Sequence, residues 1–197
     1  MQYPLELRFK VIALASQIYV TDNTGNDIFY VKQKLFKFKE AIEIYRSSNK
    51  DQLLYTLQAD RIIDLSPQFT LRDGQSGEEL GTIKRYGARS LFKASYDLSI
   101  SGNLFAHLRE ANGWVKVADG LFGEIPIIGL FAGYLFHPKY IVEDMNSTQL
   151  TTLEKIPAFF EGKFLLHNQG LSKTSEQNQS IAAALLMTVA LLERSRG

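Results

Sequence analysis

Two groups of basic residues lie close together in the sequence, each interleaved with aromatic residues. They are Lys32, Lys34, Lys37 and Lys39 around Phe36 and Phe38, and Lys84, Arg85, Arg89 and Lys93 around Tyr86 and Phe92. Such side chains can bind anionic lipid, because each basic residue near an anionic membrane contributes about 1 kcal/mol. The same pattern fits solvent-facing positions of amphipathic strands, on which lysines prevent the pairing of strand edges. Both interpretations stay open at this point.

The net charge of the chain disfavours nucleic acid as a partner. The chain has 22 Lys and Arg residues against 21 Asp and Glu residues, a net charge of +1. A near-neutral chain has no global field that attracts nucleic acid, so a basic site must be local. We therefore expect no nucleic-acid partner.

Residues 121–136 form an apolar stretch with one charge, one proline and three glycines. The proline and the glycines make a continuous helix unfavourable. A large exposed apolar patch is rare on soluble proteins unless it is functional. The stretch is therefore either a buried plug at one end of the fold or a loop that contacts a membrane or a partner protein. The contact candidates are Phe122, Ile127, Ile128, Phe131, Tyr134 and Phe136.

Catalytic and metal-binding motifs are missing from the sequence. The chain has no Gly-x-Ser-x-Gly elbow, no Walker loop, no Gly-x-Gly-x-x-Gly motif and no cysteine. His107, His137 and His167 are isolated, and residues 22–27 resemble a calcium loop but lack the acidic residue at its twelfth position. These features favour a hairpin turn at 22–27. We expect no enzymatic activity, no metal and no cofactor.

The compartment is predicted from the cysteine count and the apolar segments. Without cysteine there is no disulfide framework, which is typical of a cytoplasmic protein. The apolar residues 11–15 are too few for a secretory signal, and 181–192 fall short of the ~20 residues of a membrane span. We expect a cytoplasmic protein with no transmembrane span, peripheral to the membrane if it binds lipid.

These candidate residues are positioned by a repeated unit of strand, polar turn and strand. Asn, Asp and Gly favour the turns, and the flanking β-branched and aromatic residues favour strands. The turns recur about every 25 residues up to Gly102, which is the spacing of hairpins. Residues 3–170 are therefore predicted to form antiparallel β-hairpins.

The end of the chain, 174–195, is predicted to be a helix. Thr174 and Gln177 have the spacing of a capping box. From Ile181 onward the helix is apolar on every side, so it must be enclosed. A closed barrel of hairpins encloses it and leaves no exposed strand edge. The fold class is thus mainly β, an antiparallel barrel around a hydrophobic C-terminal helix, with residues 1–197 as a single domain.

Three segments carry a resemblance to a known family. They are Val31-Lys32-Gln33-Lys34-Leu35-Phe36, Leu80-Gly81-Thr82-Ile83-Lys84-Arg85, and the ending from Ile181 to Arg194. With them the chain resembles the tubby C-terminal-like superfamily, which includes LURP-one-related proteins and phospholipid scramblases. The resemblance implies a tubby-like barrel of about twelve strands around the last helix. It also implies phosphoinositide binding or lipid scrambling as activities known in the superfamily.

The chain departs from the scramblase pattern in two ways. Residues 167–174 contain no Asp or Glu where scramblases carry an acidic calcium loop, and the palmitoylated cysteines are absent. Calcium-triggered scrambling is therefore not expected. The function predicted from the sequence is a non-enzymatic binding module that contacts anionic phospholipid at a membrane surface. The alternative is a protein-interaction or scaffold domain that docks a partner through residues 121–136.

Overall fold

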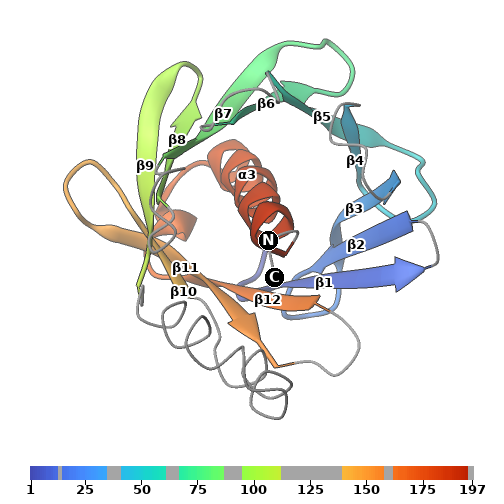
Figure 1. The fold of residues 1–197 in the computed structure, drawn as a ribbon, viewed down its shortest axis with the longest axis horizontal. Helices are drawn as coiled ribbons and strands as arrows, with labels where there is room; N and C mark the ends of the chain where they lie inside the picture. Colours follow the sequence, from blue (N-terminus) through green and yellow to red (C-terminus); the bar gives the residue numbers. More distant parts are fainter. Residues whose placement is uncertain are drawn as a thin grey trace, which may run out of the picture.

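The computed structural model describes residues 1–12, 15–34, 41–60, 67–86, 95–111, 139–157 and 162–194. Within these ranges twelve strands close into a barrel, and one long helix runs through its interior (Figure 1). The prediction of an antiparallel barrel of about twelve strands around a C-terminal helix is confirmed.

The elements follow one another along the chain in the order of the barrel. The strands are β1 Leu5–Ile12, β2 Ala15–Thr21, β3 Asp27–Lys34, β4 Ile42–Tyr45, β5 Leu53–Ala59, β6 Gln68–Asp73, β7 Glu79–Tyr86, β8 Ser95–Ile100, β9 Asn103–Glu110, β10 Lys139–Glu143, β11 Gln149–Ile156 and β12 Gly162–Asn168. A 3-10 helix, η1 (Leu171–Lys173), leads into the helix α3 (Glu176–Arg194). Each strand pairs antiparallel with its neighbours in sequence, and β1 pairs with β12 to close the barrel.

Alternation along the strands decides which side chains face α3. In β7, residues 81, 83 and 85 are buried while their neighbours are more exposed. In β8, the buried residues are 96, 98 and 100. Because successive side chains of a strand point to opposite faces, these buried residues share the interior face of the barrel.

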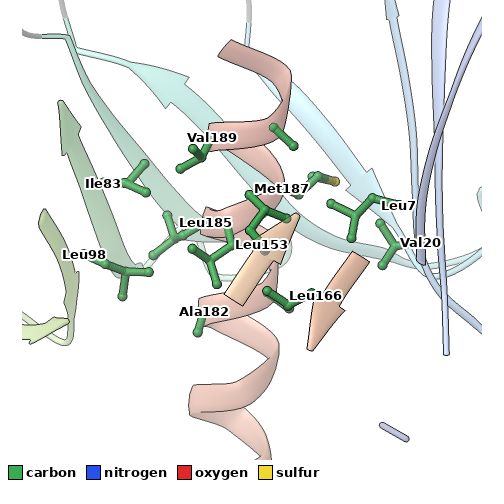
Figure 2. Packing of buried hydrophobic residues seen from close by; sticks show 14 of the residues in the cluster. Leu7, Val20, Ile83, Leu98, Leu153, Leu166, Ala182, Leu185, Met187 and Val189 are labelled. Atoms are coloured by element: carbon green, nitrogen blue, oxygen red, sulfur yellow. The ribbon is translucent and has the colours of Figure 1, made fainter. Parts of the chain in front are cut away.

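Every residue of α3 from Ile181 to Leu191 is buried. Leucines, alanines and Met187 of this segment pack against strand residues such as Ile83, Leu98 and Leu166 (Figure 2). Thr188, the polar residue in the segment, donates its hydroxyl to the carbonyl of Ala184. The helix predicted to be apolar on all sides is therefore enclosed on all sides.

The helix begins one residue later than the capping-box spacing predicts. Ser175 caps it, because the Ser175 hydroxyl accepts the backbone N–H of Asn178 at 3.2 Å. The hydroxyl of Thr174 instead donates to the carbonyl of Leu171 and closes η1. Because the Thr174 hydroxyl is used in η1, Ser175 takes the N-cap position of α3 in its place.

The two ends of the barrel differ in how the strands are joined. At one end, the turn rim, the strands are joined by the tight turns 22–26, 46–52, 74–78, 101–102 and 144–148. The opposite end, the far rim, is defined by the strand ends Ile12, Ala15, Lys34, Ile42, Ala59, Gln68, Tyr86, Ser95, Glu110, Lys139, Ile156 and Gly162. Between the strands at the far rim, residues 13–14, 35–40, 61–66, 87–94, 112–138 and 158–161 lie outside the described residues. α3 starts beside the turn rim, where Ser180 bonds Tyr55 at 2.7 Å, and runs toward the far rim.

Candidate functional site

The candidate basic residues belong to strands that end at the far rim. Lys32 and Lys34 lie at the end of β3, and Lys84 and Arg85 lie at the end of β7. β4, β5 and β6 separate these two strands, so the described parts of the two groups are not adjacent. Four other candidates, Lys37, Lys39, Arg89 and Lys93, lie outside the described residues, as do Phe122, Ile127, Ile128, Phe131, Tyr134 and Phe136.

Lys84 and Tyr86 form a cation–π pair on the outer face of β7. The Lys84 Nζ lies 5.3 Å from the centroid of the Tyr86 ring, and the Tyr86 side chain is 40% exposed. Burial and a hydrogen bond with Asp97 raise the pKa of the Tyr86 phenol, so the ring stays neutral. Lys32 is exposed on the outer face of β3, in register with Gln17. Within the described residues, neither Lys32 nor Lys84 forms an ion pair.

Arg85 points the other way and is buried inside the barrel. It is 6% exposed, and its guanidinium carbon lies 6.0 Å from the centroid of the Tyr96 ring on β8. The alternation of β7 places Lys84 outside and Arg85 inside. Arg85 therefore does not share an outer surface with Lys84, and it can reach an anionic group only within the barrel.

Other basic residues on the outer face are neutralised by acids. Arg109 bonds Glu143 at 2.8 Å, and Lys139 lies 3.7 Å from Glu154. Partial burial opposes ionisation of Glu6, but hydrogen bonds from Lys163 and Arg8 outweigh it and lower the pKa of Glu6. Among the described residues, these paired charges leave no broad basic surface on the outer face of β9–β12 and β1.

Polar side chains also line the interior near the far rim, a feature that sequence reasoning missed. Each strand from β7 to β11 contributes one residue in phase with its buried apolar residues: Arg85, Tyr96, Glu110, Tyr140 and Lys155. Glu110 pairs in register with Tyr140, and Arg85 pairs with Tyr96. The signal in the sequence is a polar residue at an apolar position of the alternation, as in Ala106-x-Leu108-x-Glu110.

The turn predicted at 22–27 is present between β2 and β3 as residues 22–26, since Asp27 begins β3, and the Asp22 carboxylate accepts hydrogen bonds within it. The Asp22 Oδ1 accepts the N–H groups of Thr24 and Asn26 at 3.1 and 3.0 Å, and the Thr24 hydroxyl at 2.7 Å. The Asn26 amide donates to the other oxygen at 3.4 Å. The hydrogen bond from the Thr24 hydroxyl is the largest cause that lowers the pKa of Asp22, from 3.8 to about 2.

The Asp22 carboxylate predicts an acid-dependent loss of stability. Its folded-state pKa lies below the unfolded value, so its contribution is complete above about pH 4 and disappears as the pH falls toward about 2. Asp22→Asn keeps the shape of the side chain but carries no charge at any pH. We expect the variant to melt several degrees below the wild type at pH 6, with the gap closing between about pH 4 and 2. A gap that stays constant over this range, measured by thermal melts, would contradict the role of the charge.

The histidines have separate partners. The His107 Nδ1 lies 2.6 Å from Asp97 Oδ1, and the His167 Nε2 lies 3.8 Å from Glu154. His137 lies outside the described residues. The part of the chain that the structure describes holds no group of three or more His, Asp or Glu side chains arranged to hold a metal ion.

The comparison with known families agrees with this architecture. A family model described as LURP-one-related matches residues 5–112, which is more than half of the chain. The chain belongs to the LURP-one-related family. This family is part of the tubby-like C-terminal superfamily, so the resemblance seen in the sequence is confirmed. The matched region of this LURP-one-related chain covers β1 to β9 and the basic strand ends of β3 and β7.

A solved structure shares the fold. It is the X-ray structure of a protein from Arabidopsis thaliana, with a TM-score of 0.50 and 13% sequence identity. The match covers 100% of this LURP-one-related chain and 94% of the plant protein. A search of the curated proteins gave no match. In the described ranges, this LURP-one-related chain has no helix of the length and apolar character that a membrane crossing requires.

Proposed function

We propose that this LURP-one-related barrel binds an anionic phospholipid surface with its far rim. The proposal rests above all on topology. Three of the strands, β3, β7 and β9, end at the far rim, and the strands that follow them, β4, β8 and β10, begin there. The chain between β3 and β4 carries Lys37 and Lys39, and the chain between β7 and β8 carries Arg89 and Lys93. The chain between β9 and β10 carries the apolar residues 121–136. Basic and apolar candidates therefore belong to connections that start and end at one rim.

The described residues at this rim support the proposal. Lys32 and Lys84 are accessible cations without an ion pair among the described residues. Tyr86, beside Lys84, combines an exposed ring with a polar hydroxyl, a side chain suited to a membrane–water interface. Basic side chains supply attraction to anionic lipid, and an interfacial aromatic ring adds apolar contact.

The test compares vesicles of phosphatidylcholine with and without phosphatidylserine in a flotation assay. We expect binding to the phosphatidylserine vesicles only, weakening as salt is added, because salt screens exposed charges. Lys32→Ser with Lys84→Ser removes two cations from the far rim. It should weaken binding on the order of 10-fold to 30-fold, at about 1 kcal/mol for each residue.

The matched control removes two lysines near the turn rim. Lys50 lies in the β4–β5 turn and Lys173 in η1, and both are exposed. Lys50→Ser with Lys173→Ser changes the net charge by the same amount, so it should bind vesicles like the wild type. Equal weakening by both double variants would mean that net charge alone drives binding, and absence of binding would reject the proposal. Docking of a protein partner through residues 121–136 remains the alternative in that case.

A further inference from the structure

Charged side chains lie inside the barrel at the far rim, where the interior is otherwise largely apolar. Arg85 on β7 is 6% exposed and Glu110 on β9 is 5% exposed. Lys155 on β11 alternates with the buried Leu153 and is half-buried. The three side chains place two positive charges and one negative charge on the same interior sector. Among the described residues, this sector therefore has one more positive charge than negative charges.

Arg85 is the buried cation of this sector, and no acid that the structure describes pairs with it. Its Nε has no hydrogen-bond partner, and it forms no ion pair with Glu110 or with any other residue that the structure describes. Its guanidinium carbon lies over the Tyr96 ring, 6.0 Å from the centroid. Buried charges in proteins are normally paired, because burial removes the water that solvates them. Among the described residues, Arg85 thus has an aromatic neighbour but no anionic partner for its buried charge.

The missing group must be an anion that fits a guanidinium edge. The contact with the Tyr96 ring supplies no hydrogen-bond acceptor, and the N–H groups of a guanidinium donate in its plane. Guanidinium binds phosphate oxygens in a bidentate manner, and the low dielectric of the interior strengthens the pair. Arg85 precedes Tyr86, the last residue of β7, so it lies at the end of the barrel proposed to face lipid.

We infer that Arg85 forms an anion subsite inside the far rim that takes the phosphate group of a phosphate ester. The inference deepens the proposed function and rests on it, because a lipid headgroup at the far rim is the nearest source of such a group. The outer lysines attract the anionic surface, and Arg85 binds one headgroup phosphate. A soluble phosphate ester has the same chemistry, and the experiment separates the two sources.

The first arm measures melting temperature with glycerol 3-phosphate as the soluble probe, against sodium chloride of equal ionic strength. A ligand that binds only the folded state raises the melting temperature, so the wild type should gain about 3 °C or more near saturation. Arg85→Met keeps the length of the side chain and removes the charge. It should show no gain with the probe, while without the probe it should melt at or above the wild-type temperature, because it removes a buried unpaired charge.

The matched control is Arg109→Met, which removes an arginine that is paired with Glu143 on the outer face. It should keep the full gain with glycerol 3-phosphate. Absence of a gain in the wild type overturns the subsite even if Arg85→Met fails to fold. A gain that Arg85→Met retains overturns it as well.

The second arm repeats the phosphatidylserine flotation with Arg85→Met. About tenfold weaker binding, together with the lost gain in melting temperature, supports the subsite with lipid as the source. Unchanged vesicle binding with a lost gain supports the subsite with a soluble ester as the source. Vesicle binding by the wild type without any Arg85-dependent effect overturns the subsite and leaves the proposed function standing.

Discussion

Leu185→Asp is expected to abolish the folded protein. Leu185 is 0% exposed and lies in the middle of the enclosed part of α3, with Ile83 and Leu98 on the barrel side (Figure 2). The substitution removes a buried apolar side chain, which costs about 2–5 kcal/mol, and adds a buried carboxylate, which costs several more. The total approaches the whole stability of a domain, about 5–15 kcal/mol.

A series at the same helix separates the causes of this loss. Leu185→Ala should remain folded and lose about 2–5 kcal/mol in chemical denaturation, since it creates only a cavity. Gln177→Asp places the same acid at an exposed position in the first turn of α3, where negative charge is favourable, and should melt like the wild type. Soluble Leu185→Asp protein with an unchanged melting curve would show that α3 is not enclosed.

The enclosed helix and the barrel could be predicted because their signals are local. An apolar run on every side of a helix, such as Ile181 to Leu191, demands cover from the rest of the chain. Asp22 and Gly25 predict their turn because the carboxylate bonds its own backbone and glycine adopts the positive φ of 83° found there. Neither inference needs to know which strands are neighbours.

The placement of charged side chains needed information that the sequence carries only weakly. Lys84 and Arg85 are adjacent and of like charge, so the sequence suggests one basic group. Successive side chains of a strand point to opposite faces, so the two residues lie on opposite faces of β7. Bulges add a further difficulty, because the register shifts between Val20 and Thr21 and between Leu71 and Arg72 interrupt simple alternation. The interior position of Glu110 follows from the phase of β9, which the pairing with β8 and β10 establishes.

The helix α3 lies close to the sheet at Gly81, which belongs to one of the segments that carry the family resemblance. A Cβ at this position would lie 2.5 Å from the carbonyl oxygen of Ser99 on β8. It would also lie 3.2 Å from Leu185 Cδ1 and 3.3 Å from Ile181 Cγ2. A side chain at position 81 therefore has no room between the neighbouring strand β8 and the helix α3.

Gly81→Ala is expected to lose about 3 kcal/mol of unfolding free energy in chemical denaturation, a large effect for one methyl group. The Ser99 carbonyl belongs to the β7–β8 pairing and cannot move away without disturbing that pairing.

Gly77→Ala is the matched control, because Gly77 lies in the β6–β7 turn with no atom within 4 Å of an added Cβ. It should lose only about 1 kcal/mol, from its positive φ of 73°. Leu185→Ala removes the nearer of the two helix contacts and leaves Ile181 and the strand carbonyl in place. Gly81→Ala should therefore cost about as much in the Leu185→Ala background as in the wild type. A clearly smaller cost in that background would assign the close approach to the helix and not to the strand.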